Sequence, residues 1–220
     1  MQLLIVLSAF IWLVTAEPPT DEEREEIVEF HTRIRENVNP PASNMQLMGY
    51  SPELENLAKQ YAQIGCAGPY PDPNTHSQFQ GYGIVTNSDN KYDQTIISNL
   101  DENYKRGKQA YSYDTNSCTG YCSRFKTMVW SQTTAVGCTI KACQRQGILL
   151  TVCLYKPGEF EPEDRPYEKG QSCTKCPNGF ACYRNQCKST SSAVTTTSSV
   201  TITSPLQMLP ALLLILRCSV

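Results

Sequence analysis

The sequence has no large excess of charge of one sign, and it has no apolar run long enough to cross a membrane. Acidic and basic residues nearly balance over 220 residues, with a net charge of −2. That balance gives no indication of the basic surface that a nucleic-acid partner requires. Histidine is scarce, with only two residues, and no Asn-x-Ser/Thr acceptor for an N-linked glycan is present. What remains is an ordinary globular composition apart from eleven cysteines.

The N-terminus predicts a secretory signal peptide over residues 1–16. Residues 3–14 are apolar except for Ser8, and the small residues Thr15 and Ala16 follow at a suitable cleavage point. The run is short for a membrane span, although the basic residues that usually precede it are missing. An N-terminal anchor is the alternative.

The C-terminus predicts a stalk and a removed anchor signal. Residues 189–205 are mostly Ser, Thr and Val, which is typical of an O-glycosylated stalk. The apolar run 206–216 would reach about 16 Å as a helix, roughly half of a ~30 Å hydrocarbon core, so it cannot span. Small residues, a polar spacer and the tail 206–220 suit a glycolipid (GPI) anchor signal. The alternative is a short secreted tail.

A secreted chain changes the interpretation of the cysteines, because thiols pair in an oxidising compartment. Ten cysteines lie outside the tail, which fits five disulfides. The spacing of Cys173 and Cys176 would suggest zinc in a cytosolic protein, but disulfides are the expected state here. The segment 173–187 has almost no apolar residues, so we expect its bridges to hold it together.

Three helices are predicted before the cysteine-rich middle of the chain. Residues 20–38 begin with a Thr20/Glu23 capping box and carry apolar residues at helical spacing. Residues 51–66 begin with Ser51 and Pro52, and residues 94–104 form a third helix. We expect His31, beside the apolar stripe of the first helix, to be a structural histidine hydrogen-bonded inside the fold.

The region 122–155 predicts the short buried strands of one sheet, including the run FKTMVW and the run GILLTVCLY. The segments 65–90 and 111–121 read as loops because they are rich in Gly, Pro, Asn and Ser. Residues 156–171 predict an extended connector. Any functional site is expected on the surface of this sheet.

Several motifs in this order resemble the CAP superfamily, which includes cysteine-rich secretory proteins, venom allergens and plant pathogenesis-related proteins. They are FHTRIRENVNPPASNMQLM, LAKQYAQIGC, HS, FKTMVW, VGC, AC and VCLYKPGEF. Helminth venom allergen-like proteins are one of the groups that the motifs resemble. The resemblance implies an α+β fold, an α–β–α sandwich with a three-stranded antiparallel sheet over residues 17–170. A small disulfide-rich hinge would follow at 171–188.

The resemblance also implies most of the disulfide pairing. Its usual bridges correspond to Cys66–Cys143 and Cys138–Cys153, and the hinge implies Cys173–Cys182 and Cys176–Cys187. Cys118–Cys122 is expected as a local pair.

Most members of this superfamily present two histidines and two glutamates around a cleft that can bind zinc. Here His76 and Glu102 match, but Tyr82 replaces the first glutamate and Arg124 replaces the second histidine. A zinc site needs about three protein ligands, and a fixed cation opposes metal binding. We therefore expect no metal, no cofactor and no catalytic residue, and we expect Arg124 to pair with Glu102.

The function implied by the resemblance is extracellular binding of sterols or fatty acids. The ligand would lie between the two middle helices or under the loop after the last strand, where Tyr155 and Phe160 either contact it or pack locally. The alternative is a secreted or anchored protein–protein effector, and a metal-dependent hydrolase is a third candidate. No nucleic-acid partner is expected, and the membrane is reached only through a C-terminal lipid anchor.

Overall fold

The computed structural model describes residues 18–158, 161 and 163–190. The predicted signal peptide, the anchor signal and nearly all of the predicted stalk lie outside the described residues, as does Phe160. Within the described ranges, no helix combines the length and apolar character needed to cross a bilayer.

The three predicted helices are confirmed, with small differences at their ends. Helix α1 spans Asp21–Glu36, α2 spans Pro52–Ala67 and α3 spans Ile96–Ala110. The capping box at α1 is formed, since the Thr20 hydroxyl accepts from the Glu23 amide and the Glu23 carboxylate accepts from the Thr20 amide. Thr95 and Ser98 form a second capping box at α3, whereas the Ser51 hydroxyl caps α2 by accepting from the Leu54 amide alone.

A four-stranded sheet runs in the order β1-β5-β6-β2. Strands β5 (Ala135–Cys143), β6 (Ile148–Lys156) and β2 (Gly83–Asp89) are antiparallel, as the resemblance implied. The fourth strand, β1 (Gly49–Tyr50), adds only two residues, parallel to β5.

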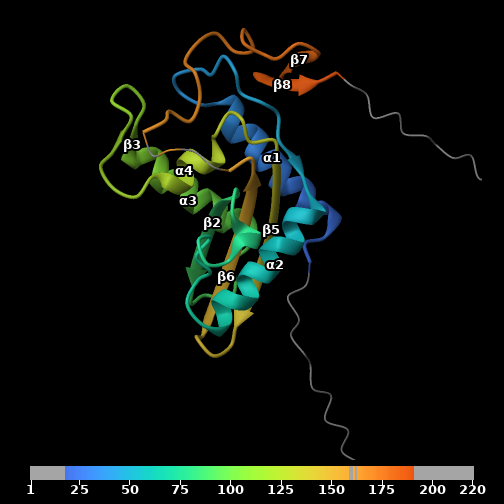
Figure 1. Ribbon diagram of the computed structural model, residues 1–220, viewed down its shortest axis with the longest axis vertical. Coiled ribbons are helices and arrows are strands. Elements are labelled where there is room, and N and C mark those ends of the chain that lie inside the picture. The colour runs from blue at the N-terminus through green and yellow to red at the C-terminus, as the bar shows by residue number, and fades with distance from the viewer. Residues whose placement is uncertain (1–17, 159–160, 162, 191–220) are drawn as a thin grey trace, which may run out of the picture.

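Helices cover both faces of the sheet, giving three layers (Figure 1). Alternate residues of β6 point to opposite faces: Val152 and Leu154 pack in a core with α2, whereas Cys153 and Tyr155 pack in a core with α1 and α3. Helix α2 lies very close to β5, because a Cβ atom on Gly137 would come within 2.2 Å of the Glu55 amide nitrogen. These contacts make an α–β–α sandwich.

The run FKTMVW is not a strand, and that part of the sequence interpretation was wrong. Residues Ser123–Met128 form helix α4, which packs beside α3. Phe125, Met128 and Val129 are all buried, and their spacing of three and four residues puts them on one face of a helix. A short apolar run does not by itself distinguish this pattern from a buried strand.

The prediction of irregular loops at 65–90 and 111–121 was also incomplete. The first contains a 3-10 turn at Ser77–Phe79 and all of strand β2. Strand β2 pairs only with β6, so it is an edge strand. The sequence did not predict it, because its residues Thr86, Asn87 and Ser88 are polar. The second contains a small hairpin of β3 (Tyr111–Ser112) and β4 (Ser117–Cys118).

The hinge forms a hairpin of β7 (Phe180–Tyr183) and β8 (Gln186–Ser189), which lies over the C-terminal end of α1 (Figure 1). Backbone hydrogen bonds join Cys187 to Met45 and Leu47. The five disulfides have the pairing expected above: Cys66–Cys143, Cys118–Cys122, Cys138–Cys153, Cys173–Cys182 and Cys176–Cys187.

Candidate functional site

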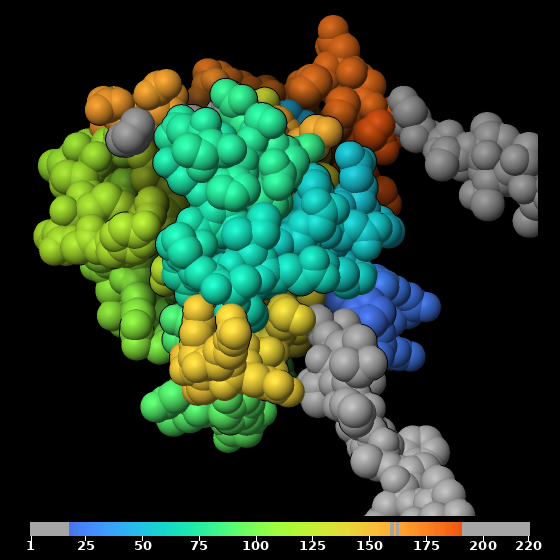
Figure 2. All heavy atoms as spheres, turned by 60° about the horizontal axis from the view of Figure 1, so that its bottom comes forward, coloured from blue at the N-terminus to red at the C-terminus, as the bar shows by residue number. Residues whose placement is uncertain are grey.

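The segment between α2 and β2 carries the first two predicted cleft residues. His76 precedes the 3-10 turn, and its Nδ1 atom lies 3.0 Å from the Thr75 hydroxyl. Tyr82 ends the segment, with the Lys156 ammonium 5.7 Å from its ring centre. In Figure 2, α2 and this blue-green segment cover the middle of one face of the molecule. The two side chains therefore belong to a covering loop, and each interacts with its own local neighbours.

The other two predicted residues lie where α3, α4 and β2 meet. The Glu102 carboxylate pairs with Arg106, one turn further along α3, at 2.5 Å. Arg124 of α4 donates to the side-chain oxygens of Asn103 at 3.0 Å and Thr86 at 3.5 Å. The predicted Arg124–Glu102 ion pair is therefore wrong, because each group finds a nearer partner.

A chain of amide and hydroxyl groups runs inward from this point. The Asn87 amide donates to the Asn99 side chain at 2.7 Å and approaches Glu102 at 3.5 Å. The Asn99 amide then donates to the buried Thr151 hydroxyl at 2.8 Å. Sequence reasoning missed the role of Asn99 and Asn103, although their spacing of four residues beside Glu102 marks one polar face of α3. The network fixes α3 on the sheet, and the polar side chains that form it are hydrogen-bonded to one another.

This donor set does not fit a zinc ion. Among the described residues, no three His, Cys, Asp or Glu side chains come together closely enough to hold a metal. Glu102 is paired with Arg106. The guanidinium of Arg124 is hydrogen-bonded to Asn103, the residue that follows Glu102. A cation entering here would meet fixed positive charge and too few anionic ligands.

Tyr155, one of the two predicted lipid contacts, is a core residue. Its side chain is completely buried, and its hydroxyl lies 3.0 Å from Nε2 of His31. Burial raises the pKa of Tyr155 well above its usual range. His31 is equally buried, and its Nδ1 atom lies 2.7 Å from the Ile27 carbonyl. The prediction of a structural histidine is confirmed, and Tyr155 packs locally in the core, which was the second of its two alternatives.

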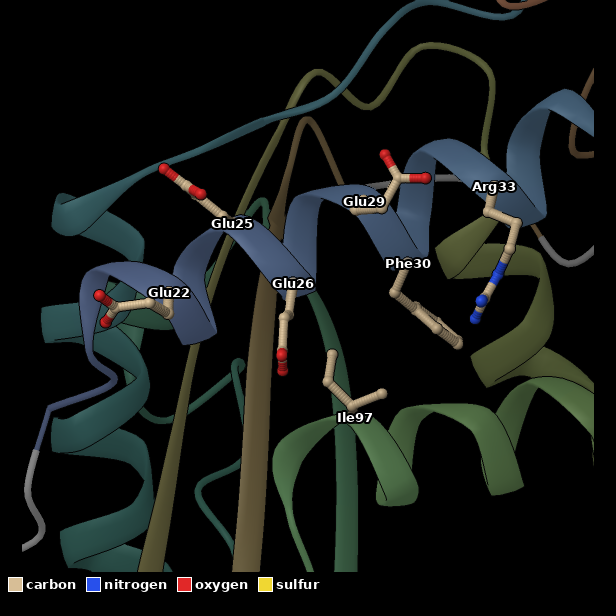
Figure 3. Close-up of a pocket in the computed structure, with 7 residues that line it drawn as sticks. All are labelled: Glu22, Glu25, Glu26, Glu29, Phe30, Arg33 and Ile97. Carbon is tan, nitrogen blue, oxygen red and sulfur yellow. The ribbon is translucent and has the colours of Figure 1, made fainter.

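A groove of about 570 Å³ lies between α1 and α3 (Figure 3). Phe30 of α1 and Ile97 of α3 face each other across it, and Arg33 lies at one end. The remaining lining residues are four glutamates of α1: Glu22, Glu25, Glu26 and Glu29. The groove therefore has apolar walls and an acidic border.

Comparison with known proteins agrees with this architecture. The model of the CAP, or cysteine-rich secretory protein, family matches residues 28–155. The chain belongs to the CAP family. A similar curated protein is peptidase inhibitor 16 of Mus musculus, 29% identical over 177 residues, which cover 77% of this chain and 34% of that protein.

Two solved structures resemble this CAP protein. Schistosoma mansoni venom allergen-like protein 4 is 29% identical with a TM-score of 0.56, over 69% of this chain and 97% of that one. NaASP2, solved with Zn²⁺, is 22% identical with a TM-score of 0.61, over 77% of this chain and 96% of that one. The second likeness concerns the fold alone.

The chain spans 34% to 41% of the peptidase inhibitor 16 sequences from three mammals. Membership of the family supports a secreted protein. It does not assign a ligand.

Proposed function

We propose that this CAP protein is an extracellular, non-enzymatic binding module whose ligand is a sterol. The observation that carries the proposal is the α1–α3 groove with Phe30 and Ile97 on its walls. Its volume of about 570 Å³ lies within the ~300–1,000 Å³ typical of small-molecule sites. The groove replaces the loop after the last strand as the binding site, because Tyr155 is enclosed.

The charge on the groove favours a neutral amphiphile over a fatty acid. Glu26 extends along the groove toward Ile97 (Figure 3). A second carboxylate about 4 Å away would be repelled by roughly 1–4 kcal/mol, depending on solvent exposure. A sterol hydroxyl is uncharged and can donate a hydrogen bond to a glutamate. Arg33 does not reverse this preference, because its guanidinium already interacts with the Phe30 ring, 5.7 Å from the ring centre.

Binding of radiolabelled cholesterol and palmitate to the full chain tests the proposal. Ile97→Gln should weaken cholesterol binding roughly tenfold, because it removes apolar contact area from a half-buried wall residue. Ile64→Gln on α2 is the matched control, since Ile64 is also half-buried in a helix but lies outside the groove. Glu26→Gln should improve palmitate binding and leave cholesterol binding nearly unchanged. Absence of saturable cholesterol binding at micromolar protein contradicts the proposal.

The non-enzymatic part of the proposal is supported by the interactions that the predicted cleft residues already make. Glu102 and Arg124 are engaged with other residues, and His76 interacts with its own loop. Zinc content measured after dialysis, with Arg124→His as a variant that adds a ligand, tests this part. Stoichiometric zinc in the unmodified protein would revive a metal-dependent enzyme.

A protein–protein effector is the second candidate, favoured by the acidic side of α1. Glu22, Glu25 and Glu26 are exposed and have no ion pair within the described part of the chain. Such a surface complements a basic partner. Capture of extracellular proteins by the full chain should then weaken with added salt and on replacement of these three glutamates by glutamine. The name of peptidase inhibitor 16 makes proteases a class to look for first.

A further inference from the structure

A second pocket, separate from the α1–α3 groove and from the predicted cleft, lies near the C-terminal ends of α1 and α3. Its volume is about 230 Å³. Its lining residues come from the segment after α1, from α3, the β3 region, α4 and the connector to the hinge: Val38, Asn39, Tyr104, Lys108, Tyr111, Tyr113, Phe125 and Tyr167. Segments distant in sequence therefore bring five aromatic rings to one place.

The rings pack against one another and form preset walls. Tyr104 and Tyr111 both contact Phe125, with ring centres 5.7 Å and 5.6 Å apart. Tyr113 and Tyr167 stack at 4.9 Å. These separations are those of favourable aromatic pairs, so the walls do not need a ligand to hold their positions.

The hydroxyl groups around the pocket are not all bonded to described protein atoms. Tyr111 donates to the Asn116 side chain at 2.7 Å, and Tyr113 donates to the Tyr167 carbonyl at 2.8 Å. Tyr167 is only 4% exposed, yet its hydroxyl makes no hydrogen bond with any described residue. Burial, with Tyr113, Tyr111 and Tyr104 close by, raises the pKa of Tyr167, so the group stays a neutral donor. The Tyr167 oxygen is not among the buried polar atoms that lack a partner, so it is open to water, and an acceptor on a ligand would replace that water.

Basic side chains lie beside the aromatic rings of the pocket. Lys108 is the charged residue among the described lining residues, and its ammonium lies 5.4 Å from the Tyr104 ring centre. Lys126 lies 6.0 Å from the Tyr111 ring centre, and Arg165 lies 5.6 Å from that of Tyr113. Carboxylates of Glu163 and Asp164 act on Lys126, and those of Asp114 and Glu168 act on Tyr113. Lys108, which lines the pocket itself, is therefore the cation that attracts an anionic ligand and repels a cationic one.

We propose that this pocket binds a small planar aromatic carboxylate, with the ring between the aromatic walls and the carboxylate accepting from Tyr167 and facing Lys108. The volume lies below the ~300 Å³ at the low end for drug-sized ligands, which limits the ligand to one or two rings. Such a ligand supplies an acceptor for the Tyr167 hydroxyl and a negative charge for Lys108 together. The site is independent of sterol binding in the α1–α3 groove.

Calorimetric titration of the full, disulfide-bonded chain with indole-3-acetate tests the site. We expect saturable 1:1 binding, and at least tenfold weaker binding of tryptamine, which keeps the ring system but carries a cation. Tyr167→Phe keeps the ring and removes the hydroxyl, and Lys108→Gln removes the cation at an exposed position that does not endanger folding. Each should weaken indole-3-acetate roughly tenfold, the effect of a hydrogen bond to a charged group.

Matched controls are Tyr183→Phe, at a half-exposed tyrosine of the hinge, and Lys105→Gln, at an exposed lysine of α3 paired with Asp101. Both should bind like the unmodified protein. The proposal is overturned by no saturable binding up to about 1 mM ligand, roughly −4 kcal/mol. It is equally overturned if tryptamine binds as well, if Tyr167→Phe and Lys108→Gln both leave affinity unchanged, or if Ile97→Gln abolishes binding.

Discussion

Two basic side chains on α1, His31 and Arg35, are enclosed by the core without any acidic partner among the described residues. Arg35 donates to five carbonyls, those of Gln46, Met128, Trp130, Ser131 and Thr133. Burial lowers the pKa of Arg35 to about 9 and that of His31 to about 4. Arg35 therefore ties the segment after α4 to α1, and His31 ties α1 to Tyr155 of β6.

The burial of His31 predicts a loss of stability in mild acid. The unfolded chain binds the proton at the ordinary pKa of 6.5 and the folded chain only near 4, so stability falls as pH decreases through this window. About 2 kcal/mol should be lost between pH 7 and pH 5, measured as the change in urea unfolding free energy. His31→Gln should lose this dependence, whereas His76→Gln should keep it. An equal fall in all three proteins would contradict the assignment.

At the scale of elements, the hinge hairpin is attached to α1 by more than its disulfides. Arg184, in the turn between β7 and β8, pairs with Glu29 and Glu36 of α1, each at 2.6 Å. Its guanidinium lowers the pKa of both carboxyl groups through these hydrogen bonds. The buried Gln186 amide also donates to the Thr32 carbonyl at 3.1 Å. The sequence predicted that disulfides hold this segment, and the structure adds its packing on α1 to them.

Arg184→Met should loosen the hinge without unfolding the sandwich. Loss of both ion pairs removes one of the attachments of the hairpin to α1, so the amides of Cys187 and Leu47, which join the hinge to the 45–47 segment, should exchange faster with deuterium. Amides of α2 should be unaffected. Arg145→Met, at an exposed arginine of the β5–β6 turn, is the charge-matched control and should leave hinge exchange unchanged. Unchanged protection of Cys187 and Leu47 in Arg184→Met would show that the ion pairs are not needed.

At the scale of the whole molecule, Cys66–Cys143 is a long-range disulfide, because it joins the end of α2 to the end of β5 across 77 residues. Cys118–Cys122 closes only four residues. Chain entropy makes the first bridge worth about 4.5 kcal/mol and the second about 2 kcal/mol. Both bridges lie within the same folded chain, so their removal can be compared directly.

Replacing both cysteines of each pair by serine should therefore destabilise the protein unequally. The Cys66/Cys143 double variant should lose roughly twice the unfolding free energy lost by the Cys118/Cys122 double variant, measured by guanidinium unfolding at pH 7. The Cys118/Cys122 variant serves as the control for the chemical change itself. Equal losses would mean that local contacts, and not loop closure, dominate the effect of these bridges.

The sequence determined the features that depend on neighbouring residues: the capped starts of α1 and α2, the even number of cysteines outside the tail and the composition of both ends of the chain. It also carried the motifs of the CAP family and the replacement of the donors at Tyr82 and Arg124. Helix caps and apolar periodicity involve residues close together in the sequence, so they can be predicted without the tertiary structure.

Only the tertiary structure decided the features that depend on which segments meet. Whether Tyr155 faced a ligand or the core was settled by the packing of α1 on β6, and the partner of Arg124 by the approach of α4 to α3. Strand β2 exists because β6 offers it a pairing edge, despite its polar sequence. The tyrosine pocket joins α3, α4 and the connector to the hinge, and no window of sequence contains it.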